Sequence, residues 1–435
     1  MAKAPKSVLL RSYQVGFGDC FLLTFVYSQQ DKRHILIDFG TTELPRKKKP
    51  SEHMPRVARQ IAADCEGQLT AIVATHRHAD HISGFGTDSK TGKSGEIIYQ
   101  LKPKLVIQPW TEDPKAAKNA KRATTDSARS TKSFISGLNA MHRVSEAVLA
   151  LSRRPPAWMG PQLAKDLQFL GMDNIKNRSA VENLIKMGKA SGAKAAWVWY
   201  GSDAGLGKLL PGVKVRVLGP PSLEQSEKIR KQRSKDVDQF WHLLAGAASS
   251  KALPLAEGLI ARASRTKSAA RTPPEARWFR DRLQRLRGQQ MLEIVRSLDS
   301  QMNNTSVILL FEVGSKKLLF PGDAQIENWS YALEDAPDHK AVRKLLSRVD
   351  LYKVGHHGSL NATPKKLLWD GFKKRGQRRQ LKTALSTLPG KHGKPVNDTE
   401  VPRRPLLKAL RAESELKSTN DLKAKDLYFD HALTV

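Results

Sequence analysis

Residues 71–81 read Ala-Ile-Val-Ala-Thr-His-Arg-His-Ala-Asp-His, and this stretch decides the fold. The apolar run 71–74 predicts a buried strand that ends at Thr75. It is followed within six residues by four side chains of metal-binding type: His76, His78, Asp80 and His81. Imidazole nitrogens and carboxylate oxygens hold zinc and similar dications, and a tight turn after a strand directs several of them at one point. The stretch therefore predicts a metal-binding loop at the edge of a sheet.

Two later strands end in the same kinds of residue. Residues 317–323 read Lys-Leu-Leu-Phe-Pro-Gly-Asp, which predicts a strand that delivers Asp323 after a Pro-Gly turn. Residues 351–359 read Leu-Tyr-Lys-Val-Gly-His-His-Gly-Ser, which predicts a strand that delivers His356 and His357. In a chain with 12 His and 42 Asp plus Glu, an isolated histidine pair is usually a solvated or hydrogen-bonded feature. Three occurrences of a strand followed by a ligand-type residue favour one shared site instead.

The order of these motifs resembles the metallo-β-lactamase superfamily, in which a His-x-His-x-Asp-His loop, a later Asp and a final His each follow a strand. The closer similarity is to the metallo-β-lactamase domain of bacterial competence proteins that import DNA. It covers the core elements from about residue 8 to about residue 395. Its remaining motifs are Gly16-Phe17-Gly18-Asp19, Asp38 in the run 35–40, Asn303 or Asn304 with Ser306, and Gly355 to Ser359. Gln14 and Phe17 depart from it, because the subgroup usually carries Asp and Gln there.

The resemblance implies an α/β protein with an αββα metallo-β-lactamase sandwich, and the alternation of strands and helices agrees with it. Because the ligand motifs are spread from His76 to His357, we expect one catalytic domain over residues 1–435. Two basic helical insertions are expected, at 111–192 and 222–300. Short strands are expected near residues 7–15, 20–27, 34–38, 71–75, 104–108, 197–200, 213–218, 305–313 and 317–321, with a helix near 55–65.

The resemblance also implies roles at a centre with two divalent metal ions, zinc in the first place and manganese in the second. His76 and His78 would hold one ion. Asp80 and His81 would hold the other with a terminal histidine, and Asp323 would bridge both through its two oxygens. We expect His357 to be the ligand and His356 to face the substrate, with the reverse assignment open. The expected catalytic residues are Asp80, His356, Asp19 and Ser306.

Further residues are expected around the centre. Asp38 is expected to orient a ligand histidine, whose other ring nitrogen needs a partner. Asn304 and Ser359 are expected near the mouth of the site. Lys353 is expected either to bind a substrate phosphate or to face solvent. His392 is expected to contact substrate or to serve only in a turn. The two histidines in the insertions, His142 and His242, are not expected to bind metal.

The second informative feature is a net charge of +32, from 74 Lys plus Arg against 42 Asp plus Glu. Such an excess repels itself unless a polyanion neutralises it. Because the basic residues are dispersed, they suit sequence-independent binding of the DNA or RNA backbone. The alternative is a basic proteome or an acidic protein partner. Aromatic residues make up only 6% of the chain, so a base-stacking platform is not indicated.

Location and cysteine chemistry are also suggested by the sequence. The first residues lack a long apolar segment, and nowhere do 18 apolar residues run together, so secretion and a membrane location are disfavoured. Cys20 and Cys65 lack zinc-type pairing and are expected to be reduced structural residues of a cytoplasmic protein.

The motifs and the charge together predict a metal-dependent nuclease or phosphodiesterase, in which a hydroxide activated by two metals attacks phosphorus. A free nuclease is toxic, so regulation by a protein partner through the insertions is expected. Two alternatives are open: a metallo-hydrolase of a small ester, lactone or thioester, and a non-catalytic nucleic-acid-binding subunit. The sequence does not decide between DNA and RNA.

Overall fold

The computed structural model describes most of one compact unit, which is formed by Met1–Asp113, Asn177–Ser226 and Asn303–Val435. The described ranges are 4–45, 48–112, 177–222, 225–226, 303–359, 361–377, 380–391 and 400–435, with the single residues 152, 155, 159 and 161. The histidines at 142, 242 and 392 and most of both expected insertions lie outside these residues.

Within the described ranges, one sheet has seven strands in the order β13-β1-β2-β3-β4-β5-β6. The strands are β1 Ser7–Tyr13, β2 Cys20–Val26, β3 Lys32–Phe39, β4 Ala71–Val73, β5 Leu105–Pro109, β6 Lys194–Val198 and β13 Tyr428–Thr434. Strands β13 to β3 pair antiparallel, and strands β3 to β6 pair parallel. The parallel half brings the carboxyl ends of β3, β4 and β5 to one edge of the sheet.

The second sheet has six strands among the described residues, in the order β12-β11-β10-β9-β8-β7. They are β7 Val213–Gly219, β8 Ile308–Val313, β9 Lys316–Phe320, β10 Leu351–Lys353, β11 Lys382–Leu385 and β12 Glu415–Ser418. Strands β9 to β12 are parallel, and the hairpin of β8 and β9 is antiparallel. This sheet therefore also has an edge where parallel strands end together.

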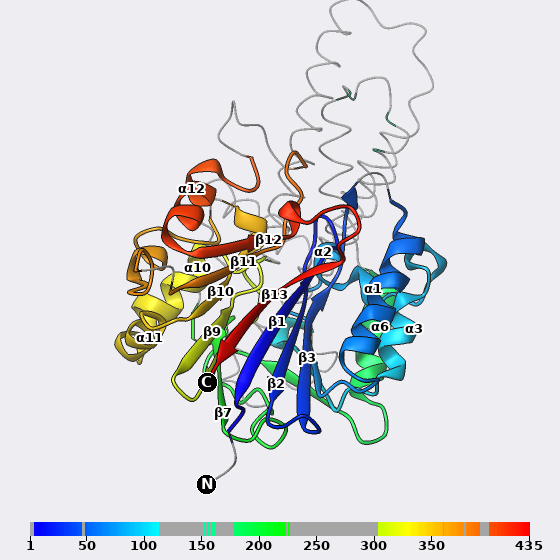
Figure 1. Ribbon diagram of the computed structural model, residues 1–435, viewed down its shortest axis with the longest axis horizontal. Coiled ribbons are helices and arrows are strands. Elements are labelled where there is room, and N and C mark those ends of the chain that lie inside the picture. The colour runs from blue at the N-terminus through cyan, green and yellow to red at the C-terminus, as the bar shows by residue number, and fades with distance from the viewer. Residues whose placement is uncertain are drawn as a thin grey trace, which may run out of the picture. The chain divides into compact units, whose positions relative to one another are not determined.

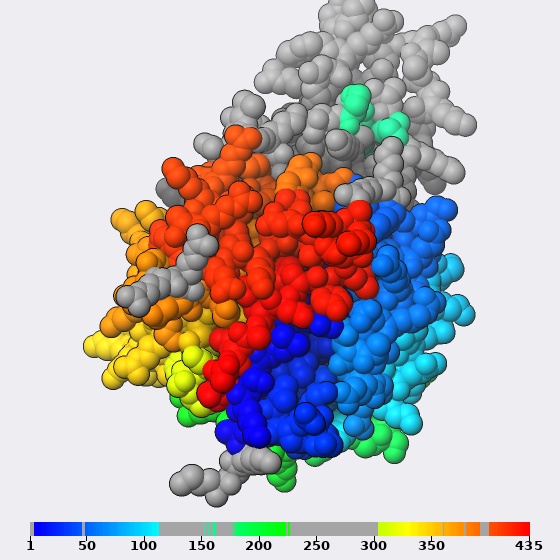
Figure 2. All heavy atoms as spheres, viewed as in Figure 1, coloured from blue at the N-terminus to red at the C-terminus, as the bar shows by residue number. Residues whose placement is uncertain are grey.

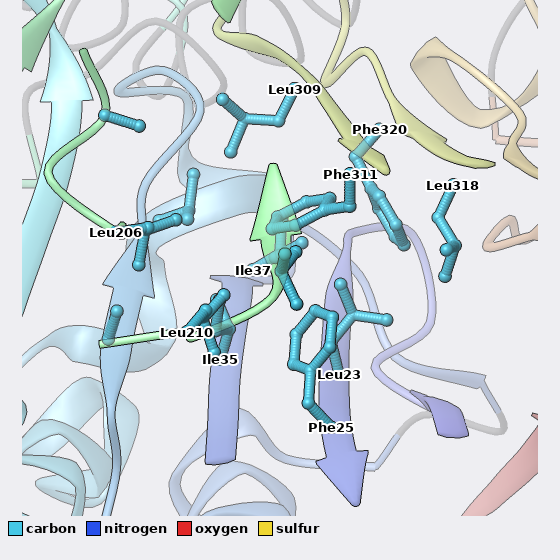
Figure 3. Packing of buried hydrophobic residues seen from close by; sticks show 14 of the residues in the cluster. Leu23, Phe25, Ile35, Ile37, Leu206, Leu210, Leu309, Phe311, Leu318 and Phe320 are labelled. Atoms are coloured by element: carbon cyan, nitrogen blue, oxygen red, sulfur yellow. The ribbon is translucent and has the colours of Figure 1, made fainter. Parts of the chain in front are cut away.

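The two sheets pack face to face through alternating apolar side chains. Leu23 and Phe25 of β2 point toward Phe311 of β8 and Phe320 of β9 in the interior (Figure 3). The alternate residues of each strand point the other way, as Leu22 does on β2, because successive side chains of a strand face opposite sides of the sheet. The central strands are buried on both faces, so they consist of nearly continuous apolar runs.

Helices cover the outer face of each sheet, on opposite sides of the strands (Figure 1). The first sheet carries α1 Pro50–Asp64, α3 Ser94–Gln100 and α6 Arg178–Gly188, and the second carries α10 Ile326–Ser330, α11 His339–Leu346 and α12 Arg404–Glu413. A short helix, α2 Ala79–Ile82, follows β4. The expected α/β class is therefore confirmed, with layers in the order helix, sheet, sheet, helix.

Two elements differ from the expected pattern. Helix α6 falls inside the segment 111–192, yet its residues Ala180, Leu184 and Met187 pack into the core beside the first sheet. Strand β13, near the end of the chain, was not anticipated. It pairs with β1 along its whole length, and Figure 2 shows the two segments side by side in red and blue.

The cysteines and the helices agree with two simpler expectations. Cys20 and Cys65 are both free and buried. No helix in the part of the chain that the structure describes is long and apolar enough to span a lipid bilayer.

Candidate metal centre

Four chain segments converge where the parallel strands of both sheets end. The loop after β4 carries His76 to His81, and Asp38 lies near the end of β3. The turn after β9 carries Asp323, and a 3-10 turn after β10, η7 His356–Gly358, carries both terminal histidines. Residues that lie far apart in the sequence thus meet at one edge of the sandwich, as the strand-end pattern predicts.

The principal cluster consists of Asp80, His81, Asp323 and His357, which we call the four-residue group. All four are buried, and one potential ligand atom of each lies within 4.8 Å of the others. His81 Nε2 is 3.0 Å from Asp323 Oδ2, and His357 Nε2 is 2.9 Å from Asp80 Oδ2. The geometry places His357 rather than His356 in this group, as expected.

A second cluster consists of His76, His78 and Asp80, which we call the three-residue group. The Nε2 atom of His76 lies 3.0 Å from the Nδ1 atom of His78. Burial, aided by the neighbouring histidines, lowers the pKa of His76 well below its ordinary value. Burial also lowers the pKa of His78, to about 4. Both rings are therefore neutral near pH 7, which is the form that binds metals.

The residue common to both groups is Asp80, whereas the expected bridge was Asp323. The two oxygens of Asp323 face different partners. Oδ1 accepts hydrogen bonds from the backbone N–H of His356, at 3.2 Å, and from Lys353, at 3.4 Å. Oδ2 faces His81 and has no hydrogen-bond partner. Only one oxygen of Asp323 is therefore presented to the cluster, which differs from the expected bridging through both.

The donor set fits a cation. The Nδ1–H of His81 donates to Asp38 at 2.7 Å, so the Nε2 atom of the neutral ring carries a lone pair, and this atom faces the oxygen of Asp323. His357 repeats the arrangement, because its Nδ1–H donates to the carbonyl of Ser386 at 3.1 Å while Nε2 faces Asp80. Asp80 Oδ1, His81 Nε2 and Asp323 Oδ2 are buried without hydrogen-bond partners. Lone pairs this close repel one another unless a positive charge lies between them.

The electrostatics point in the same direction. Burial opposes the charged form of His81, but Asp323, Asp80 and Asp38 outweigh it and raise the pKa of His81 well above its ordinary value. Burial alone would raise the pKa of Asp80, but His81 and the hydrogen-bonded His357 outweigh it and hold that pKa well below the usual range. The carboxylates thus stay ionised and attract a proton or a metal cation into the cluster.

Asp38 orients the loop rather than lining the cluster. Its Oδ2 atom accepts the hydrogen bond from His81, and its two oxygens also accept from the backbone N–H of Thr75 at 2.8 Å and from the Thr75 hydroxyl at 2.7 Å. Both oxygens of the carboxylate accept hydrogen bonds, and they fix both the ring and the start of the loop. This is the role expected for Asp38.

Lys353 meets neither of the two expectations, which were contact with a substrate phosphate and exposure to solvent. It neither faces solvent nor presents a free ammonium to a substrate, because only 2% of its surface is exposed and its charge is paired with Asp19 and Asp323. Asp19, an expected catalytic residue, is completely buried beneath the cluster. Its Oδ1 atom lies 3.5 Å from His357 Nδ1. Asp19 therefore contacts the residues that support the centre and has no surface exposed to a substrate.

Ser306, an expected catalytic residue, is buried, and so are Asn304 and Ser359, which were expected near the mouth of the site. Ser306 is completely buried, and its hydroxyl accepts the backbone N–H of Asp323 at 3.3 Å, so it positions that aspartate. Asn304 is also completely buried, and its amide donates to Glu327. Ser359 donates its backbone N–H to the carbonyl of His356 at 2.8 Å. His356 is the most exposed of the terminal pair, with 24% of its side chain accessible, as expected for a residue that faces a substrate.

Close packing of the backbone explains two glycines of the motifs. A Cβ atom on Gly40 would lie 2.4 Å from the backbone of Asp80 and His81, and one on Gly18 would lie 2.7 Å from the carbonyl of Asp80. The loop after β4 therefore rests directly on these two glycines. Asp38, His356 and His357 themselves adopt left-handed backbone conformations, which cost free energy for residues other than glycine.

Sequence reasoning missed several supporting residues. Thr75 was taken only as the end of a strand, yet it anchors Asp38. Phe17, noted as a departure from the family pattern, packs on the His357 ring with the centroids 4.4 Å apart. Arg77 forms a paired hydrogen bond with Glu112, which ties the loop to the end of β5. The one signal for this ion pair in the sequence was the positive charge of Arg77 between His76 and His78.

No protein-family model matches this chain, and no curated protein matches it significantly. Buried histidines and aspartates from four segments form groups that could hold a metal ion.

Proposed function

We propose that this chain is a metal-dependent phosphodiesterase that cleaves nucleic acid, and that it has the αββα sandwich of the metallo-β-lactamase superfamily. The observation that carries the proposal is the four-residue group, whose ligand atoms converge from three separate parts of the chain. Three of its atoms, Asp80 Oδ1, His81 Nε2 and Asp323 Oδ2, are buried without hydrogen-bond partners. The net charge of +32 supports a polyanionic substrate.

The proposed centre takes two divalent metal ions, zinc or manganese. The four-residue group would hold one, and the three-residue group would hold the other, with Asp80 between them. Bound dications supply a water of lowered pKa and offset the charge that develops on the phosphate. The part of the protein is to keep His76 and His78 neutral, hold Asp80 ionised and bury both groups away from bulk water.

His356 has a separate role in this proposal. It is next to the four-residue group, with its Nε2 atom 3.8 Å from Asp323 Oδ2, and part of its side chain is exposed. Burial lowers its pKa, so the ring is neutral near pH 7 and can donate or accept a proton. We assign it to contact with the scissile phosphate or the leaving oxygen.

The decisive experiment is a cleavage assay with zinc or manganese on single-stranded DNA, double-stranded DNA and RNA. The variant Asp80→Ala with His81→Ala should lose more than about 1,000-fold of the activity, because it removes ligands of both groups. The matched control, Asp203→Ala with His339→Ala, removes the same residue types outside the centre and should cleave normally. Circular dichroism would show that both variants are folded.

Absence of cleavage of all three substrates by the metal-loaded protein would reject the phosphodiesterase assignment. If the metal-loaded protein instead hydrolyses a small ester, lactone or thioester, the same centre would serve the alternative hydrolase function. A protein that binds nucleic acid but takes up no metal would indicate a non-catalytic subunit.

A further inference from the structure

Lys353 is the one fully buried lysine among the residues that the structure describes. It is the last residue of β10, three positions before His356. An ammonium group removed from water costs several kcal/mol unless it is paired and hydrogen-bonded. Its position at the metal centre, which already needs positive charge, therefore requires an explanation.

Every donor of this ammonium has a partner. It donates to the carbonyl of Gly322 at 3.0 Å and to Asp323 Oδ1 at 3.4 Å, and it forms a close ion pair with Asp19 Oδ2. An ammonium has three N–H donors and no acceptor. Lys353 therefore joins the turn after β9 to the turn before β2.

These contacts pair some carboxylate oxygens of the centre with Lys353 and leave others facing the histidines. Asp19 forms a third potential cation-binding group with Asp38 and His81, and its Oδ2 atom lies 3.7 Å from His81 Nδ1. The ammonium of Lys353 already neutralises Asp19. At Asp323 it holds Oδ1, so that Oδ2 alone faces His81 and His357.

We propose that Lys353 is a positioning residue that acts as a built-in counter-cation: it excludes a metal ion from Asp19 and restricts Asp323 to one donor oxygen. This inference rests on the proposed metal-dependent function. Lys353 thereby sets how many metal ions the centre holds. Four carboxylates, those of Asp19, Asp38, Asp80 and Asp323, are buried together, and they attract a further dication when the lysine charge is absent.

The test counts bound metal on the full chain. The purified protein is saturated with Mn²⁺ or Zn²⁺, dialysed against buffer, and analysed by elemental mass spectrometry and isothermal titration calorimetry. Lys353→Met should bind one more equivalent of metal per chain than the unaltered protein. Lys353→Met with Asp19→Asn should return to the original number, because the neutral amide no longer attracts the additional ion.

Two further variants keep the test decisive if Lys353→Met does not fold. Asp19→Asn alone should leave the number of bound ions unchanged, since Asp19 is not a ligand in this proposal. Lys353→Arg retains the charge and should also leave it unchanged. The matched control is Lys317→Met, a strand lysine on β9 that pairs with Glu312 instead.

Two results would overturn the inference. Loss of one metal equivalent in Asp19→Asn would show that Asp19 is itself a ligand. A folded Lys353→Met variant with an unchanged number and affinity of bound ions would show that the lysine excludes nothing. Because no nucleic acid is present, these results are independent of cleavage. A protein that follows the expected metal counts but cleaves no nucleic acid would reject the proposed function and leave the role of Lys353 standing.

Discussion

At the scale of single residues, the centre depends on side chains that hold the ligands in place. His81 offers Nε2 to the cluster only because Asp38 holds its other nitrogen, and Asp38 is itself held by Thr75. Such supporting hydrogen bonds fix the tautomer and the direction of a ligand ring. We therefore expect their loss to weaken metal binding even though every candidate ligand remains.

Thr75→Val tests this support. The substitution keeps the shape of the side chain and removes the hydroxyl that donates to Asp38 Oδ2 at 2.7 Å. We expect the metal affinity to fall by about 10- to 100-fold, as is typical when a partner of a metal ligand is lost. Calorimetric titration with Zn²⁺ measures it. Thr24→Val is the matched control, because the Thr24 hydroxyl contacts His34 instead of the centre; an equal effect of both changes would contradict the prediction.

A second prediction concerns His34, a buried residue of β3 whose pKa is lowered by burial to about 4. The unfolded chain, with an ordinary histidine pKa near 6.5, binds the proton more readily than the folded chain. The free energy of unfolding should therefore decrease as the pH falls from about 6.5 to about 4, with a contribution of about 3 kcal/mol from this residue. His34→Gln should flatten this part of the pH profile in urea titrations. A variant with the same slope as the unaltered protein would exclude His34 as its source.

The clustering of the candidate ligands was predictable from the sequence, whereas their environment was not. Each candidate ligand lies in a loop or turn that follows a strand, so a local pattern identifies it, and parallel strands bring their ends together. The burial of Lys353 depends on Asp19, which is more than 300 positions away in the chain. Ser306 contacts Asp323 from the buried interior, and Asn304 contacts Glu327 and Asn328 instead of the cluster. A local pattern does not reveal such long-range partners.

At the scale of elements, the loop after β4 is positioned by close backbone contact. Gly40 directly follows β3 and supports the peptide between Asp80 and His81. Most strand positions were predicted within a few residues, because their apolar runs are distinct, but β13 was not anticipated. Helix α6 was assigned to an insertion, because its amphipathic sequence does not reveal which surface it covers.

Gly40→Ala tests the contact between β3 and the loop. The added methyl group would lie 2.4 Å from the backbone of Asp80 and His81, so the loop must move. We expect a loss of about 1–3 kcal/mol in the free energy of unfolding, together with weaker metal binding. Thermal denaturation and metal titration measure the two effects. Gly371→Ala serves as the control, because nothing lies within 4 Å of its added Cβ atom; similar losses in both variants would argue against a specific contact.

At the scale of the whole molecule, the net charge of +32 dominates the expected interactions. Binding of a phosphate backbone releases condensed counterions, so its affinity decreases steeply with salt. The order of sheets and helices explains why the candidate metal centre lies at one edge of the sandwich, but the fold alone does not specify a function.

Salt dependence provides the matching prediction. If about six phosphates are contacted, the affinity for a DNA or RNA fragment should fall by about 1,000-fold between about 50 and 200 mM salt. Fluorescence anisotropy at several salt concentrations measures the slope. An oligomer of the same base sequence with an uncharged backbone is the control and should not bind. Equal affinity for both oligomers would assign the positive charge to a different partner.

The left-handed backbone at His356 and His357 has a consequence for evolution. Glycine would adopt these conformations at less energetic cost, so each histidine is retained in opposition to local conformational preference. Selection for a robust fold alone would replace them, and persistence of the pair across related sequences would therefore record selection for chemistry. In laboratory evolution toward thermostability, we expect substitutions by glycine at these two positions to stabilise the fold and to remove the histidines of the candidate centre.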